Sequence, residues 1–144
     1  MFKATQKNLP TDIAVFAAAV GDFKVSHNQK EKIKKLDNFT LKLEKNVDIL
    51  SYVSNHNSMR PKIVVGFAAE TTNIEENAIQ KLKNKNCDWI IANDVSKNEI
   101  GFDSENNEVM IFYKNKNMET ERLSLKKKSE ISEEIVDRLV AQLN

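Results

Sequence analysis

The chain has 144 residues, of which 40% are hydrophobic and 30% charged. That length fits one domain, residues 1–144, with enough apolar side chains for a single core. The net charge of +1 excludes a uniformly basic nucleic-acid binder and an acidic tail. The single cysteine, Cys87, excludes a disulfide framework and a thiolate-rich zinc site.

Membrane and phosphate-loop motifs are missing from the sequence. No apolar stretch approaches the roughly 20 residues of a transmembrane helix, and residues 1–12 lack the apolar core of a signal peptide. We therefore expect a cytoplasmic protein with neither a membrane nor a nucleic acid as partner. The chain has three glycines, too few for a glycine-rich phosphate loop.

Three apolar runs predict the buried strands of a parallel sheet. Continuous runs without polar alternation are typical of strands that are covered on both faces. The runs occupy residues 13–20, 63–69 and 89–92. The first is followed by Gly21 and Asp22, and the third by Asn93 and Asp94.

A helix is predicted between the second and third runs. Thr72 and Glu75 have the spacing of a capping box. An apolar face then follows at i, i+4 and i+8, formed by Ile74, Ala78 and Leu82. Residues 62–92 are therefore expected to form a right-handed strand–helix–strand unit.

Shorter elements surround this unit. Residues 40–43 alternate like a short strand, and Asp48 is placed to cap a helix that ends near Ser54. Residues 108–113 and 120–125 predict a hairpin, whose outer edge we expect to carry Met110 and Phe112 and to join a homodimer. A C-terminal amphipathic helix, capped by Ser129, has an apolar face made of Ile131, Ile135, Leu139 and Leu143.

Candidate ligand positions lie where the predicted parallel strands end, because open parallel sheets bind ligands there. Small residues at the ends of the first two runs let a ligand approach the backbone, although alanines also suit tight helix packing. Seven lysines and four acidic residues fall between residues 22 and 45, a local excess that suits a triphosphate but equally suits a solvated loop. Lys81 and Lys85 share one helix face, where solvation is the ordinary role.

Several other reactive residue types carry no functional motif. Cys87 is expected to be a small buried group, and Trp89 a core residue. His27 and His56 lie in polar loops without surrounding motifs.

Six short motifs in order carry a family resemblance. They are AAVGDF at 18–23, KIKK at 32–35, NVDI at 46–49, GFAAET at 66–71, ANDVS at 92–96 and GFDS at 101–104, followed by Asn107. Together they resemble bacterial phosphopantothenate–cysteine ligase, which is usually the C-terminal half of a bifunctional coenzyme A biosynthesis protein. The resemblance covers essentially the whole chain.

The resemblance implies an α/β fold, a Rossmann-like three-layer sandwich with a mostly parallel sheet and a β-hairpin extension, and a homodimer. It also implies CTP as co-substrate and a divalent metal, normally Mg²⁺. The family joins 4′-phosphopantothenate to CMP as an acyl-cytidylate and releases pyrophosphate. The amine of cysteine then attacks that anhydride. Lysines and a metal suit this chemistry, since the triphosphate charge must be neutralised.

The same resemblance assigns site residues. Lys32 and Asp22 are implied as catalytic, Asp22 also as the metal-side carboxylate, and Lys32→Ala is expected to weaken CTP binding more than Lys34→Ala or Lys35→Ala. The implied nucleotide-binding positions are Phe16, Ala17, Ala18, Ala19, Asp22, Lys32, Asn46, Val47, Asp48, Ile49, Phe67, Lys81 and Lys85, with Asn93 a looser match to a substrate contact. Of these, Ala18 and Ala19 adjoin the acyl intermediate, and residues 46–49 read the cytosine.

Departures from the family pattern leave two other interpretations open. Val47 replaces the usual proline and Gly21 a small residue such as alanine. A further N-terminal portion of the ligase domain, with an asparagine for the second step, has no counterpart here, nor has the flavin-dependent half, so no flavin is expected. The chain alone is expected to be a poor ligase that needs a separate N-terminal polypeptide. Alternatives are a non-catalytic nucleotide-binding or dimerisation remnant and an unrelated α/β binding domain.

Overall fold

A computed structural model of the chain describes residues 1–27, 31, 38–96, 104–115 and 117–143. The elements in chain order are α1 (Phe2–Lys7), β1 (Ile13–Phe16), β2 (Phe23–Val25), β3 (Leu43–Lys45), α2 (Ile49–Ser54), β4 (Ile63–Glu70), α3 (Ile74–Lys85), β5 (Trp89–Asp94), β6 (Asn106–Tyr113), β7 (Glu121–Lys127) and α4 (Lys128–Leu143).

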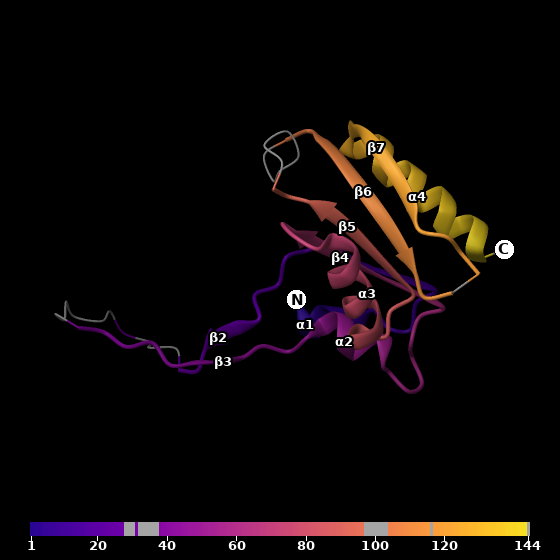
Figure 1. Cartoon of the computed structure of the whole chain (residues 1–144). Coiled ribbons are helices and arrows are strands. Elements are labelled where there is room, and N and C mark those ends of the chain that lie inside the picture. Colours follow the sequence, from indigo (N-terminus) through magenta and orange to yellow (C-terminus); the bar gives the residue numbers. More distant parts are fainter. Residues whose placement is uncertain (28–30, 32–37, 97–103, 116, 144) are drawn as a thin grey trace.

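The main sheet has five strands in the order β1–β4–β5–β6–β7. Strands β1, β4 and β5 are parallel, and Val65 pairs with Trp89 between the last two. Strands β6 and β7 add an antiparallel hairpin beside β5. Strands β2 and β3 form a separate antiparallel pair, which projects from the body as an arm (Figure 1). The predicted α/β fold with a mostly parallel sheet and a hairpin extension is confirmed.

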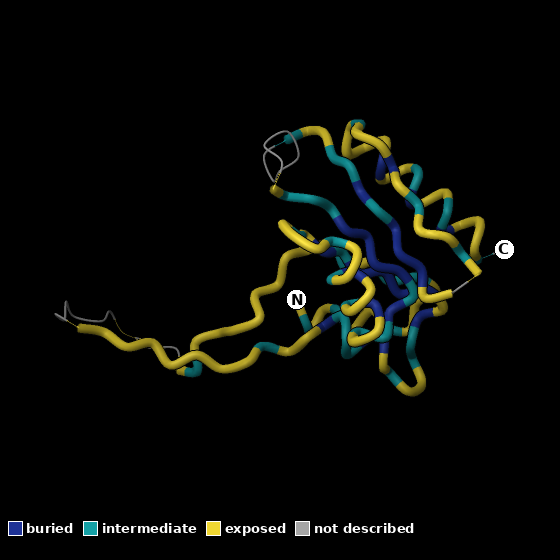
Figure 2. The backbone as a smooth tube through the Cα atoms, viewed as in Figure 1, coloured by how far each residue is buried: buried dark blue, intermediate teal, exposed yellow. Residues whose placement is uncertain are grey.

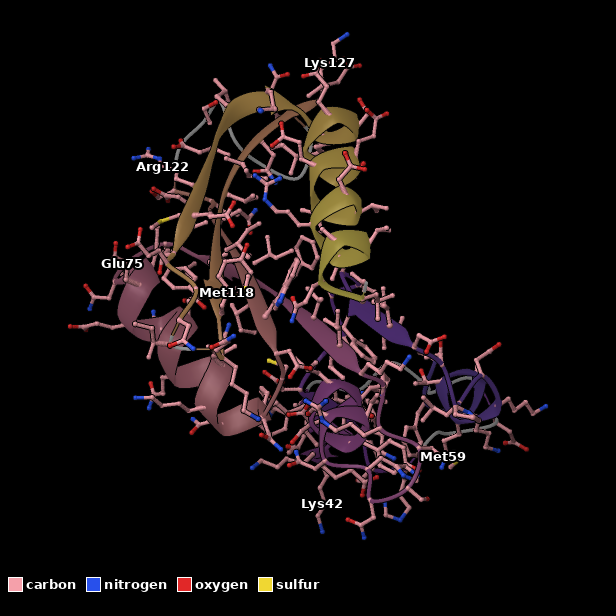
Figure 3. The ribbon with its side chains drawn as sticks, turned by 90° about the vertical axis from the view of Figure 1, so that its right-hand side faces the viewer. Lys42, Met59, Glu75, Met118, Arg122 and Lys127 are labelled. Carbon is pink, nitrogen blue, oxygen red and sulfur yellow. The ribbon has the colours of Figure 1, made fainter. Side chains whose placement is uncertain are left out.

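Helices cover both faces of the sheet and complete three layers. Successive side chains of β4 and β5 point to opposite faces, so Val65 and Ile91 pack in one core with Ile135 of α4. On the other face, Val64 and Ile90 pack in a second core with side chains of α2 and α3. Figure 3 shows α3 and α4 on opposite sides of the strands. The buried strands are the dark centre of Figure 2.

The predicted apolar faces of the two long helices are confirmed. Ala78 and Leu82 are buried on α3, and α4 buries Ile131, Ile135 and Leu139. The start of α3 differs from the prediction, since no capping box forms. Asn73 occupies the N-cap in the left-handed region, with φ 49° and no side-chain cap bond. Helix α4 begins at Lys128, one residue before the expected cap.

The first apolar run forms a shorter and more exposed strand than predicted. Strand β1 ends at Phe16, and Val15 and Val20 are 48% and 40% exposed. The physical reason is position. Among the described residues β1 pairs only with β4 at the sheet edge, so one side of the strand is uncovered. The short strand expected at 40–43 lies at Leu43–Lys45 instead.

The expectation for the hairpin edge was wrong. Met110 and Phe112 lie on β6, which pairs with β5 on one side and β7 on the other. Phe112 is 3% exposed, because it packs in the core under α2 and α3. The outer strand is β7, so these two residues offer no edge for a partner.

Arg60 fixes the C-terminal ends of the two helices that border the site. Its Nε donates to the Ser54 carbonyl at the end of α2, at 2.7 Å. Its Nη2 donates to the Asn86 carbonyl after α3, at 3.1 Å, and to Asp88 Oδ2, at 2.9 Å. Asp88 Oδ2 also accepts from the Val64 N–H at 2.7 Å, so α2, α3, β4 and β5 share one anchor.

Two predictions on single residues are confirmed. Cys87 is fully buried, and burial raises the pKa of its thiol to about 11. Trp89 is also buried, and its indole N–H donates to Gln142 of α4 at 2.8 Å. None of the described helices combines the length and apolar character needed to cross a bilayer.

Candidate functional site

A pocket of about 590 Å³ lies at the carboxyl end of β1, beside the middle of β4. Open parallel sheets bind ligands outside the carboxyl ends of their strands. Six separate stretches of chain line the pocket, namely Met1 and Thr5 at the start of the chain, residues 15–22, residues 46–50, Phe67 of β4, Lys81 and Lys85 of α3, and Ile90 of β5.

Residues 17–22 run along the pocket without forming a strand. Ala17, Ala18 and Ala19 are exposed there, and their methyl groups leave the backbone accessible. A ligand in the pocket can therefore approach peptide N–H and carbonyl groups directly. Gly66 leaves room for two side chains of the pocket wall, since a Cβ there would lie 2.6 Å from a Leu50 methyl and 2.9 Å from Ile90 Cδ1.

Asn46 ties the two stretches of chain at the base of the arm. Its backbone N–H donates to the Asp22 carbonyl at 2.7 Å, and its side-chain Nδ2 donates to the Gly21 carbonyl at 3.0 Å. Its Oδ1 accepts from the Val47 N–H at 3.1 Å. These bonds hold Asp22 beside residues 46–48 at the mouth of the pocket.

Asp48 combines two roles at the start of α2. Oδ1 accepts from the Ser51 N–H at 2.9 Å, which confirms the predicted helix cap. Oδ2 pairs with the ammonium group of Lys85. Burial favours the neutral acid, but the bonds from Lys85 and Ser51 outweigh it and lower the pKa of Asp48.

Lys81 is paired with a carboxylate from a different element. Its Nζ lies 2.6 Å from Oε1 of Glu70, the last residue of β4. The other oxygen, Oε2, accepts from Asn77 Nδ2 at 2.9 Å. The Glu70 side chain is 13% exposed and that of Lys81 is 43% exposed, so the carboxylate is the anchored half of the pair.

A second pocket of about 390 Å³ adjoins the first. Both pockets are lined by Phe16–Ala19 and by Phe67. The second continues over the sheet to α4, where Ile131 and Ile135 give it an apolar wall, with Asn93 and Asn107 at its polar side. Ligands in the two pockets would therefore meet at the alanine segment.

The structure brings most of the sequence-predicted site residues together. Those lining the first pocket are Phe16, Ala17, Ala18, Ala19, Asp22, Asn46, Val47, Asp48, Ile49, Phe67, Lys81 and Lys85. Asn93 lies in the second pocket instead. Lys32 lies outside the described residues, as does most of the lysine-rich segment.

Sequence reasoning missed two contributors to the site. Glu70 stands inside the GFAAET motif, yet its pairing with Lys81 joins residues eleven positions apart in sequence. Met1 and Thr5 come from the N-cap and the body of the short helix α1, for which no sequence pattern gave a signal. Within the described ranges, no group of three or more His, Cys, Asp or Glu residues could hold a metal.

Comparison with known families adds an independent observation. The family described as "DNA/pantothenate metabolism flavoprotein C-terminal domain" matches residues 1–143. The chain is 41% identical over 129 residues to the coenzyme A biosynthesis bifunctional protein CoaBC of Haemophilus influenzae, covering 89% of this chain and 31% of that protein. It is 40% identical over 135 residues to the CoaBC protein of Escherichia coli K12, covering 91% and 32%.

Solved structures agree with these relatives. The C-terminal domain of a CoaBC protein superposes with a TM-score of 0.72 at 30% identity, over 99% of this chain and 60% of that one. The DNA/pantothenate metabolism flavoprotein from Streptococcus pneumoniae shares the fold, with a TM-score of 0.71 at 22% identity, over 98% and 68%. The chain spans about a third of the length of the curated relatives it matches.

Proposed function

We propose that this chain, which belongs to the DNA/pantothenate metabolism flavoprotein C-terminal domain family, binds CTP in the ligation of 4′-phosphopantothenate to cysteine. The observation that carries the proposal is the first pocket. Six stretches of chain bring all but two of the candidate site residues to its lining. The relatives are coenzyme A biosynthesis bifunctional proteins, which supports a role in that pathway.

The charges around the first pocket suit a nucleotide triphosphate. Lys81 and Lys85 line it, each paired with one carboxylate. A lysine ammonium has three N–H donors, so a carboxylate contact leaves capacity for phosphate oxygens. Because both lysines already balance an acid, further cations are needed for the triphosphate. We assign that part to Lys32 and to a divalent metal.

Asp22 fits a Mg²⁺ ion that is shared with the nucleotide. Mg²⁺ commonly binds one or two carboxylates, waters and substrate phosphates, and Asp22 lies in the pocket wall with its backbone fixed by Asn46. The ion would supply positive charge for the leaving pyrophosphate.

The second pocket is the proposed site of the pantothenoyl group. Its apolar wall from α4 and its two asparagines suit a chain of methyl, amide and hydroxyl groups. Since Ala18 and Ala19 border both pockets, an acid in the second would meet the α-phosphate of CTP at that segment. Such juxtaposition is the main requirement for forming an acyl-cytidylate, which the amine of cysteine would then attack to release CMP.

Pyrophosphate release tests the proposed reaction. The chain is incubated with Mg²⁺, CTP and 4′-phosphopantothenate, alone and with a polypeptide that supplies the preceding part of a relative's ligase domain. We expect release that depends on CTP and on the acid, and that ATP does not support. An absence of release in both reactions would overturn the proposal. Lys32→Ala, in the same reactions, tests the role assigned to that lysine.

The arm supports a second proposal, that the protein is a homodimer. Outside the main sheet, Phe23, Phe39, Leu41 and Leu43 are all more than half exposed, and Figure 2 shows most of the described arm as exposed. A two-stranded ribbon is unstable alone and needs a covering surface, which a second copy would provide. A Leu41→Ser/Leu43→Ser variant should shift the sedimentation mass from dimer to monomer. A wild-type chain that sediments as a monomer at every concentration would refute the dimer.

A further inference from the structure

We propose that Glu70 is a positioning residue that holds Lys81 in the orientation needed for the nucleotide, an inference that rests on the proposed CTP site. Lys81 lines the first pocket, and Glu70 does not. The carboxylate therefore acts through the lysine, from behind the pocket wall, and does not touch the ligand itself.

The geometry shows an anchored carboxylate and a presented ammonium group. Both Glu70 oxygens are engaged, Oε1 by Lys81 at 2.6 Å and Oε2 by Asn77 at 2.9 Å. Asn77 Nδ2 also donates to the Thr72 carbonyl at 3.0 Å. The Glu70 side chain is 13% exposed against 43% for Lys81, so the fixed partner is the acid.

The backbone beneath Glu70 is held independently of its side chain. Glu70 ends β4 and pairs with Asp94 of β5, and its carbonyl accepts from the Val95 N–H at 3.0 Å. Asn77 and Lys81 are one turn apart on α3. One turn of α3 thus supplies both Asn77, which donates to the Glu70 carboxylate, and Lys81, which the carboxylate positions.

The Glu70 carboxylate restricts the Lys81 side chain before the ligand binds, which favours binding. A lysine has a flexible four-carbon stem and loses much rotamer freedom when it is fixed on binding. A carboxylate that already fixes the stem lowers that cost. The same carboxylate also competes for the ammonium charge, so positioning and competition predict opposite effects when Glu70 is replaced.

Titration calorimetry with CTP and Mg²⁺ separates these effects. Glu70→Ala should weaken CTP binding about tenfold, because the lysine loses its anchor. Glu70→Gln should stay within about threefold of wild type, because the amide oxygen still accepts from Lys81. Asn77→Ala should fall between the two. Glu76→Ala, which removes an exposed acid from the first turn of the same helix, is the charge-matched control and should bind as wild type does.

A Lys81→Ala background supplies the readout that a purely structural role would not change. There, Glu70→Ala should add less than about a twofold loss, since its partner is already gone. Tighter CTP binding by Glu70→Ala and Glu70→Gln would overturn the inference in favour of competition. An equal loss in both backgrounds would overturn it in favour of a structural role. If the wild-type chain binds no nucleotide, the proposed function fails and this inference fails with it, whereas wild-type binding with an unchanged Glu70→Ala affinity overturns the inference alone.

Discussion

Two clusters of charged groups beside the parallel strands serve different purposes. At the amino end of β4 and β5, Arg60 and Asp88 bond mainly to each other and to backbone groups of four elements. At the first pocket, the lining residues Lys81 and Lys85 pair with Glu70 and Asp48. The difference indicates that the first cluster stabilises the fold, while the second presents charge to a ligand.

Removal of the amino-end anchor should have the largest effect on stability. Arg60→Ala removes the guanidinium donor from Asp88 and from the carbonyls of Ser54, Pro61 and Asn86, and breaking such a part-buried pair costs about 2–4 kcal/mol of unfolding free energy. Chemical denaturation measures that loss. Lys62→Ala is the matched control, because the Lys62–Asp12 pair is about 70% exposed on both sides and should change stability by less than about 0.5 kcal/mol. Equal losses for the two variants would contradict the anchor role.

Removal of a lysine from the wall of the first pocket should instead affect ligand binding. Lys85→Ala should weaken CTP binding about tenfold and lower the unfolding free energy by less than about 1 kcal/mol. The control is Lys83→Ala, two residues away on α3 and exposed outside the pocket. If both variants weaken CTP binding equally, and salt abolishes both effects, the lysines act only as a diffuse positive surface.

A smaller effect should appear in the pH dependence of stability. The pKa of Asp48 is lower in the folded protein than its ordinary value of 3.8. The ionised Asp48 carboxylate therefore stabilises the folded protein above pH 3.8, and this stabilisation is lost as the pH falls through the folded pKa. Asp48→Asn keeps the cap but not the charge, so its stability should fall less than that of wild type between about pH 5 and pH 2. We expect the two losses of unfolding free energy to differ by less than about 1 kcal/mol, because the pair is partly exposed. Parallel pH curves for the two proteins would show that the Asp48–Lys85 ion pair does not stabilise the fold.

The sequence predicted the elements whose burial follows a local pattern. Continuous apolar runs identified β4 and β5, and helical spacing identified the buried faces of α3 and α4. The predicted length and burial of β1 were wrong, because the exposure of this strand depends on its place at the sheet edge. A local sequence pattern does not contain that information. Likewise, Phe112 was placed at an edge because the pairing of β6 with β5 is a long-range property.

The candidate site shows the same limit. The rule that parallel strand ends share one edge correctly brought the alanine segment beside Phe67, and helical spacing put Lys81 and Lys85 on one face. The rotation of α3 relative to β4 decides which carboxylate each lysine meets, and packing sets that rotation. The Glu70–Lys81 pair therefore became visible only in the structure. The place of Lys32, outside the described residues, stays a prediction.

The measurement that tests the central claim most directly is a calorimetric titration of the chain with CTP and Mg²⁺, repeated with ATP and Mg²⁺. Polar groups of residues 46–48 and nearby backbone line the pocket, and a site built for one base leaves such groups unpaired with another. We predict CTP affinity at least about tenfold above ATP affinity. Equal affinities for the two nucleotides would contradict the claim that the pocket reads cytosine, and no binding of either would contradict the nucleotide site itself.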